Sequence, residues 1–168
     1  MAKEKMRKNR HQEGRGEPEF EQQIVDIARV TRVMAGGKRM RFRACVVIGD
    51  KKGLVGYGLA KGADVTMAIT KAVNIAKKQM IRVPLNDAGT IPHAIYEKFG
   101  SAKIFLKPAP QGTGIIAGGA MRLVLEVAGV TNVVGKILGS SNKVNNVKAT
   151  LKAIENFKLV KNRKKNTI

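Results

Sequence analysis

The sequence predicts an α+β protein built from two small domains. Three strand-like segments and one amphipathic helical segment occupy residues 21–84, and a second set of strand and helix patterns follows residue 90. A cluster of Pro, Asn, Asp and Gly within 84–92 separates the two sets. We therefore expect a β-β-β-α domain at 21–84, a linker at 85–90 and a β-β-α-β-α domain at 91–157.

The two ends of the chain are expected to lie outside these domains. Residues 1–20 form a polar, basic arm with Gly and Pro breakers, and the tail at 158–168 carries several Lys and Arg and no acid. Such segments are typical of solubilising tails or of extensions that bind RNA. The basic charge of the whole chain favours RNA binding.

This charge indicates a polyanionic partner. The 168 residues include 32 Lys and Arg against 12 Asp and Glu, which gives a formal net charge of +20. RNA, DNA and an acidic membrane surface would each match this charge. A membrane is the weakest of the three, because no apolar run approaches about 18 residues and no secretory apolar region follows the start.

Few residues could carry the chemistry of an enzyme or a metal site. Cys45 is the only cysteine, so no disulfide can form within the chain and a reducing, cytoplasmic compartment is expected. With His11 and His93 as the only histidines, the ligands are too few for a zinc site. We expect His93 to pack or to contact phosphate, and we expect no catalytic activity and no metal.

The clearest strand carries a row of arginines. It follows a turn at Gly36-Gly37 that requires positive φ. The even-numbered residues of 40–48 are apolar and share one face, whereas Arg39, Arg41 and Arg43 share the other. At roughly 6.6 Å for each pair of residues, this row spans about 13 Å, the length of a few phosphates. A solvated face explains one or two such charges more easily than an unbroken row, so the row predicts RNA binding.

The remaining patterns complete the β-β-β-α order. Residues 50–53 predict a hairpin turn, and the strand at 54–59 contains Gly56 and Gly58, which permit close backbone approach. Asp64 is a natural N-cap for a helix that is expected to run to about Met80. The buried stripe of this helix is expected to comprise Val65, Ile69, Ala72, Val73 and Ala76.

This order matches a double-stranded-RNA-binding-like domain that lacks its first helix. Such domains recognise groove shape, phosphates and 2′-hydroxyls. The strand at 54–59 lacks the stacking aromatics of the RNA-recognition motif, and only 4% of the chain is aromatic. Base stacking is therefore not expected to be the main mode of binding.

The second domain is expected to begin with a hairpin. Strands at 91–98 and 103–107 flank Gly100-Ser101, with Lys103, Phe105 and Lys107 on one face. A helix at about 114–128, a strand at 130–138 and a helix at 145–157 follow. The expected core positions of the last helix are Val147, Leu151 and Ile154.

A glycine-rich loop precedes the first of these helices. The pattern Gly112-x-Gly114-x-x-x-Gly118-Gly119 is a candidate phosphate-binding loop, because backbone amides and the helix dipole favour an anion. It has one residue too many for the dinucleotide fingerprint, and the acid expected about twenty residues later is missing. A packing role for Gly118 and Gly119 against a sheet is favoured, and no nucleotide cofactor is expected.

The residues of this loop and its surroundings resemble one protein family. The segments are KPAPQGTGIIAGGAMR at 107–122, VLEVAGV at 124–130 and LGSSN at 138–142, and shorter matches continue N-terminally at 29–30, 36–37, 47–50 and 55–58 with Lys61. They resemble the fifth protein of the bacterial-type small ribosomal subunit, over about residues 21–157. The resemblance implies that the second domain is an α/β sandwich of the ribosomal-protein-five-like kind.

The resemblance also implies a function. The chain is expected to be a structural constituent of the cytoplasmic small ribosomal subunit that binds ribosomal RNA, stabilises the head relative to the body and contributes to translational accuracy. The fourth and eighth small-subunit proteins are its expected neighbours, and no membrane, cofactor or small-molecule substrate is expected. A free RNA-binding regulator or a DNA-compacting protein would explain the charge equally well, but not the resemblance.

The expected site residues follow from both arguments. By resemblance, the loop at 31–38 approaches the helix that joins body and head and lies near the spectinomycin site. This loop departs from the family at Ala35, where lysine is common, and at Arg39-Met40. The expected RNA contacts are Arg29, Arg32, Gly36, Gly37, Lys38, Arg39, Arg41, Arg43, Lys51, Lys52, Lys61, Lys71, Lys103 and Lys107. The fourth small-subunit protein is expected to contact Gly112, Gly114 and Arg122.

Overall fold

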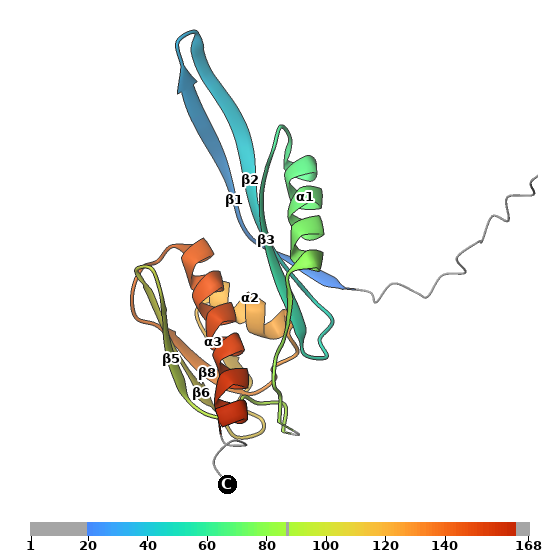
Figure 1. The fold of residues 1–168 in the computed structure, drawn as a ribbon, viewed down its shortest axis with the longest axis vertical. Coiled ribbons are helices and arrows are strands. Elements are labelled where there is room, and N and C mark those ends of the chain that lie inside the picture. The colour runs from blue at the N-terminus through green and yellow to red at the C-terminus, as the bar shows by residue number, and fades with distance from the viewer. Residues whose placement is uncertain (1–19, 87, 164–168) are drawn as a thin grey trace, which may run out of the picture.

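The computed structural model describes residues 20–86 and 88–163, with side chains as far as Phe157. The described chain forms two four-stranded sheets and three helices, arranged in four layers (Figure 1). Helix α1 covers one face of the first sheet, helices α2 and α3 lie between the two sheets, and the second sheet is outermost. The predicted basic arm up to residue 19 and the last residues of the predicted tail lie outside the described residues.

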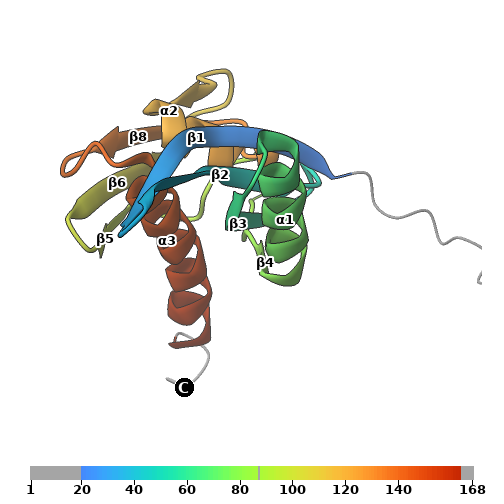
Figure 2. The same ribbon diagram turned by 90° about the horizontal axis from the view of Figure 1, so that it is seen from above.

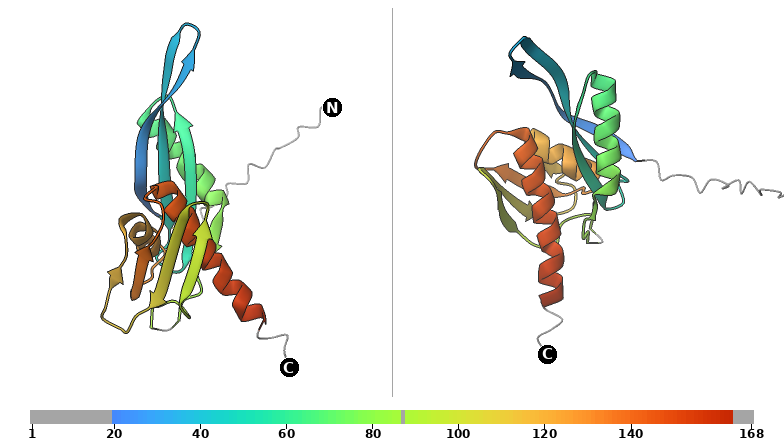
Figure 3. Two further views of the ribbon diagram at one scale, coloured as in Figure 1. Left: turned by 90° about the vertical axis from the view of Figure 1, so that its left-hand side faces the viewer. Right: turned by 45° about the horizontal axis from the view of Figure 1, so that its top comes forward.

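The first sheet has the order β1-β2-β3-β4, and all its neighbours are antiparallel. Its strands are β1 (Glu21–Met34), β2 (Gly37–Gly49), β3 (Leu54–Gly62) and β4 (Met80–Arg82). The β1–β2 hairpin is longer than the rest of the sheet, and its end extends past α1 and past the second sheet (Figures 1 and 3). The predicted turn lies at its tip, where Gly37 has a φ of +141°. Gly36 does not have a positive φ, so the expected conformation is confirmed for Gly37 alone.

Helix α1 (Val65–Lys78) packs unusually close to β3 because β3 presents glycines to it. A Cβ added at Gly58 would lie 1.9 Å from the carbonyl oxygen of Ala72, and one at Gly56 would lie 2.5 Å from that of Ala76. The expected close approach at these glycines is confirmed. The fully buried stripe is formed by alanines at 68, 72 and 76, of which Ala68 was not predicted. The larger predicted residues Ile69 and Val73 flank it, and Val65 is only half-buried and lies outside this core.

The second sheet has the order β5-β6-β8-β7. It comprises β5 (Ile95–Phe99), β6 (Ala102–Pro108), β7 (Ile115–Ile116) and β8 (Val133–Ile137), and β7 alone pairs in parallel. Helices α2 (Gly119–Val127) and α3 (Lys143–Arg163) cover one face. Figure 2 shows that α3 extends away from the second sheet, and that the first sheet lies next to it.

One hydrophobic core joins the two predicted domains. Val25, Cys45, Val47 and Val55 of the first sheet are buried in the same cluster as α2, α3 and the second sheet. The turn after β2 adds backbone contacts, because the amides of Lys51 and Gly53 donate to the carbonyl oxygens of Val127 and Ala128, both at 3.1 Å. The α+β fold with a β-β-β-α part and a β-β-α-β-α part is confirmed, and the two parts are packed rather than merely tethered.

Several element boundaries differ from the predicted ones. The first strand, which its β-rich composition predicts at 24–34, begins at Glu21. Helix α1 ends at Lys78, and the strand β4 that follows it was not expected. The helix predicted from about Gly114 begins only at Gly119, because residues 115–116 instead pair with β8. The strands predicted at 91–98 and 130–138 are shorter. The last helix is longer at both ends and includes residues 158–163 of the expected tail.

Candidate nucleic-acid interface

The end of the β1–β2 hairpin gathers basic side chains on one face. Cross-strand register places Arg32 opposite Arg39, and Arg43 opposite Lys61 on β3, and residues that face each other across a ladder share a side of the sheet. Arg41 lies on the same side because side chains alternate along β2. We call this set the arginine face; it comprises Arg32, Arg39, Arg41, Arg43 and Lys61.

Most of this face is free to meet a ligand. Arg32, Arg39, Arg41 and Lys61 are exposed and line a cleft of about 270 Å³ together with Val30, Thr31 and Met34. No acidic partner is found for these four cations among the described residues. Guanidinium groups present several donors in a fixed plane and bind phosphate oxygens in pairs, so the cleft is suited to a phosphate backbone.

Arg43 differs from the other arginines of the row. Its Nη2 lies 3.7 Å from Oδ2 of Asp26, and the side chain is about one third exposed. Asp26 also accepts a bond from Nζ of Lys143, at 3.1 Å, which brings in the first turn of α3. Through Asp26, Arg43 therefore joins the hairpin to the second domain, and it is not among the residues that line the cleft.

The other expected RNA contacts lie on three further surfaces. Arg29 and Lys38 are exposed on the opposite side of the hairpin, the side of α1, where Lys71 is also exposed. Lys51 and Lys52 occupy the turn at the other end of the first sheet, and Nζ of Lys51 lies 2.7 Å from Oε2 of Glu21. The hydrogen bond with Glu21 raises the pKa of Lys51 above its ordinary value. Lys103 and Lys107 are exposed on the second sheet.

The glycine-rich loop forms a separate surface. Gly114 and Arg122 line one shallow hollow of about 700 Å³ with Lys51, Glu126 and Thr131. Gly112 is exposed beside it. Both loop glycines require positive φ, at +91° for Gly112 and +73° for Gly114. The structure thus brings the three residues expected to contact a neighbouring protein to one side of the molecule.

Asn132 holds this loop and was not identified from the sequence. Its Oδ1 accepts bonds from the amides of Gly112 (3.0 Å) and Gly114 (3.3 Å), while Nδ2 donates to the carbonyl oxygen of Ala88 at 3.3 Å. These amides are occupied and do not form the hypothesised phosphate-binding loop. No local pattern identifies the residue, because the backbone groups that its side chain bonds lie 18 to 44 residues away in sequence.

The packing hypothesis for the two later glycines is half correct. A Cβ at Gly118 would lie 2.7 Å from Cδ1 of Ile137 on β8, so this glycine does permit close packing. Gly119 has nothing within 4 Å of a Cβ, and the expectation for it is wrong. The helix begins at Gly119, and its first turn is open on that side.

The remaining chemistry-bearing residues have structural roles. The His93 ring packs edge-on against Phe157, with ring centroids 5.0 Å apart. This agrees with the first of the two expectations for His93, that it packs. Cys45 is buried, and burial followed by the charge of Asp26 raises the pKa of its thiol to about 11. Within the described residues, no cluster of His, Cys, Asp and Glu suits a metal, and no helix is both long and apolar enough to span a membrane.

Comparisons with known proteins identify the family of this chain. Family models match two segments, "Ribosomal protein S5, N-terminal domain" at residues 20–84 and "Ribosomal protein S5, C-terminal domain" at residues 97–167. The chain is 45% identical over 152 residues to small ribosomal subunit protein uS5c of Emiliania huxleyi, covering 90% of this chain and 96% of that protein.

Bacterial relatives give the same result. The chain is 46% identical over 158 residues to uS5 of Acaryochloris marina, covering 94% and 89% of the two chains. It is 48% identical over 151 residues to uS5 of Mycoplasmopsis agalactiae, covering 90% and 65%. The chain therefore belongs to the ribosomal protein S5 family, whose members are structural proteins and not enzymes.

Proposed function

We propose that this protein is a structural component of the cytoplasmic small ribosomal subunit and binds its RNA chiefly through the end of the β1–β2 hairpin. The observation that carries the proposal is the arginine face, whose outer members have no acidic partner within residues 20–86 and 88–157 and project beyond the hydrophobic core. Membership of the family indicates ribosomal RNA as the partner, and the hairpin is the proposed contact surface.

The shape of the hairpin suits a helical RNA partner. Residues 31–41 are all exposed, so both sides and the tip can enter or cross a groove without disturbing the core. The arginine face would contact phosphates on one side, while Arg29 and Lys38 would do so on the other. A hairpin gripped on two sides by RNA would hold two RNA segments together, which is the property needed to stabilise the head relative to the body.

The salt dependence of RNA binding tests this proposal. Arg39→Gln/Arg41→Gln should weaken binding of the full chain to small-subunit RNA and make the log–log salt slope about two smaller in magnitude. The matched control is Lys78→Gln/Arg82→Gln, which removes the same charge from exposed sites at the other end of the first sheet. Equal slopes for the two variants would contradict a hairpin-centred interface.

We also propose that the hollow beside Gly114 contacts the fourth small-subunit protein and thereby influences translational accuracy. Gly112, Gly114 and Arg122 all lie on this side, and Gly114 has a φ of +73° that a side chain would strain. The eighth small-subunit protein is the other proposed neighbour, without an assigned surface. Gly114→Arg should raise the error rate of a missense or stop-codon reporter, and Arg122→Ala should do so more weakly. Normal accuracy in both, with normal assembly, would remove this interface from the proposal.

A further inference from the structure

The second sheet has an outer face that no element of the described chain covers. Helices α2 and α3 lie on its inner face, where Ile104, Leu106 and Val133 are fully buried. Side chains of alternate residues point outward. We call the outer side the open face; its residues are Tyr96, Lys98, Lys103, Phe105, Lys107, Ile116, Val134 and Lys136.

Register arranges these residues in three rows across the strands. Tyr96, Phe105 and Lys136 form the middle row, with the two aromatic residues directly opposite each other. Lys98 and Lys103 form a second row, and Lys107, Val134 and Ile116 a third. Tyr96 is 52% exposed and Phe105 is half-buried. An exposed and a half-buried aromatic residue are therefore flanked by lysines in the rows on both sides.

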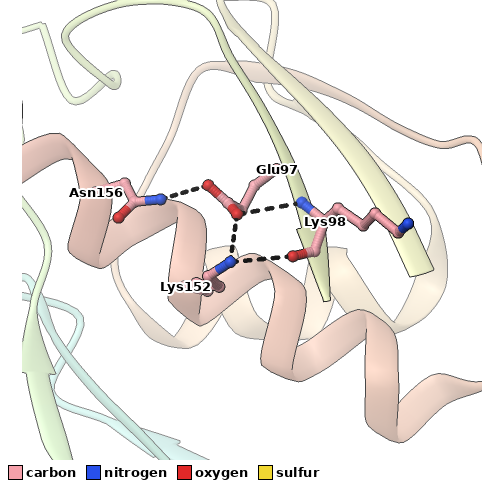
Figure 4. Close-up of polar contacts among 4 residues, drawn as sticks. All are labelled: Glu97, Lys98, Lys152 and Asn156. Carbon is pink, nitrogen blue, oxygen red and sulfur yellow. Dashed lines mark hydrogen bonds and ion pairs between the residues drawn. The ribbon is translucent and has the colours of Figure 1, made fainter. Parts of the chain in front are cut away.

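The open face carries no acid, because the one carboxylate of these strands is held on the other side. Glu97 accepts bonds from Nζ of Lys152 (2.7 Å) and from the side-chain amide of Asn156, both on α3 (Figure 4). Burial raises the pKa of Glu97, but these bonds and that from the Lys98 amide outweigh burial and leave the pKa below its ordinary value. Figure 4 also shows the Lys98 side chain directed away from α3.

This arrangement is costly without a bound anion. Lys98 and Lys103 are exposed and directly opposite, and like charges in that position destabilise a sheet. No ion pair is found for any of the four lysines of the face within the described residues. A protein partner fits the face poorly, since lysine is depleted at protein–protein interfaces. Neighbouring strands lie about 4.8 Å apart and alternate residues about 6.6 Å apart, a spacing on the scale of neighbouring nucleotides.

We propose that the open face binds unpaired ribosomal RNA, with bases stacked on Tyr96 and Phe105 and phosphates held by the surrounding lysines. This inference rests on the proposal that the chain binds small-subunit RNA, and it assigns a second contact of a different kind. The hairpin is suited to the phosphates of a duplex, whereas the open face presents a stacking platform of the type used for single strands. Low aromatic content does not prevent this, because the fold places one of the two tyrosines of the chain here.

Binding of the full chain to two RNA probes tests the assignment. The probes are a single-stranded uridine-rich oligonucleotide and a hairpin duplex of equal length. Tyr96→Ala should weaken binding of the single strand about tenfold, as expected for loss of one stacked base, and should leave duplex binding unchanged. Tyr96→Phe keeps the ring and should restore the affinity. Lys103→Gln/Lys107→Gln should weaken the single strand more than the Lys78→Gln/Arg82→Gln control does.

The outcomes separate this inference from the proposed function. Loss of duplex binding in Arg39→Gln/Arg41→Gln with unchanged single-strand binding in Tyr96→Ala would leave the hairpin interface standing and overturn the open face. Unchanged duplex binding in Arg39→Gln/Arg41→Gln with weakened single-strand binding in Tyr96→Ala would support RNA binding by the open face and contradict the hairpin interface. If Tyr96→Ala keeps both affinities but subunits isolated from cells lose a neighbouring protein, the face is a protein contact and the RNA assignment is wrong. Ultraviolet cross-linking of Tyr96 to RNA in assembled subunits would support RNA binding by the open face.

Discussion

In the outer part of the β1–β2 hairpin, residues 31–41 are all exposed, whereas residues 44–49, further along β2, are all buried. Both parts have the same antiparallel pairing with β1. The difference lies in what surrounds them: the inner part is enclosed by α1 on one side and by α2 and α3 on the other, and the outer part extends beyond all three (Figure 1).

This contrast separates stability from recognition within one pair of strands. The inner part contributes Ala44, Val46 and Ile48 to one core and Cys45 and Val47 to the other. The outer part contributes no fully buried side chain and carries most of the arginine face. Changes at the inner part should therefore alter unfolding, and changes at the outer part should alter RNA binding.

The largest stability effect is expected at Gly58, which pairs with Val46. Gly58→Ala would place a Cβ 1.9 Å from the backbone oxygen of Ala72, so strand and helix must separate, at a cost of about 3 kcal/mol. The matched control is Gly36→Ala at the tip, where a Cβ meets nothing within 4 Å and φ is not positive. Its effect should stay within about 0.5 kcal/mol. Urea unfolding measures both, and similar values would contradict the contrast.

The sequence predicts the outer part of the hairpin better than the inner part. Alternation in 39–43 correctly places the arginines and the apolar residues on opposite sides of β2, although both sides are exposed as far as Arg41. At 44–49 the run is apolar on both sides, and local periodicity does not reveal that Cys45 and Val47 face a second layer. The close approach at β3 was predictable because glycines are small wherever they lie, whereas the α1 stripe was predicted only in part: Ala72 and Ala76 are buried as expected, and the buried Ala68 was not predicted.

The features that the sequence did not predict depend on contacts between distant segments. The strand β4 exists because residues 80–82 pair with β3, and β7 exists because residues 115–116 pair with β8. The Asn132 bonds to the glycine loop have the same origin. The distribution of the expected RNA contacts also depends on the fold. Three of the basic surfaces lie apart from the arginine face, because residue type identifies a cation but not the side of the fold on which it lies.

A smaller, pH-dependent effect is expected from Cys45 in the inner part. The pKa of its thiol is raised from 9.0 to about 11 by burial and by Asp26, so the folded state holds the proton more tightly than the unfolded state does. The stability that this contributes is fully present below about pH 9 and is lost as the pH rises through about 11, by at most about 3 kcal/mol. Urea unfolding across that range, with Cys45→Ala as the reference, measures it.

A thiol in the outer part provides the matched control for this effect. Met40 is 51% exposed, so the thiol of Met40→Cys in a Cys45→Ala background should titrate alike in folded and unfolded chains. The stability of that variant should follow Cys45→Ala at every pH. If wild type also follows Cys45→Ala up to about pH 11, the Cys45 thiol is not held in its protonated form by the inner part.

The smallest effect is expected at Arg43, where the two parts of the hairpin meet. Its guanidinium lies 3.7 Å from Asp26 and is about one third exposed, so solvent screens the pair and Arg43→Gln should cost only about 0.5 kcal/mol. Arg41→Gln, with no acidic partner among the described residues, should cost nothing measurable. For RNA affinity the order should reverse: Arg41→Gln should weaken binding more than Arg43→Gln, because Asp26 already neutralises part of the Arg43 charge. A double-mutant cycle with Asp26→Asn measures the coupling, which should be present between Asp26 and Arg43 and absent between Asp26 and Arg41. Coupling of equal size to both arginines would mean that the boundary between the stabilising and the binding parts of the hairpin lies nearer its tip.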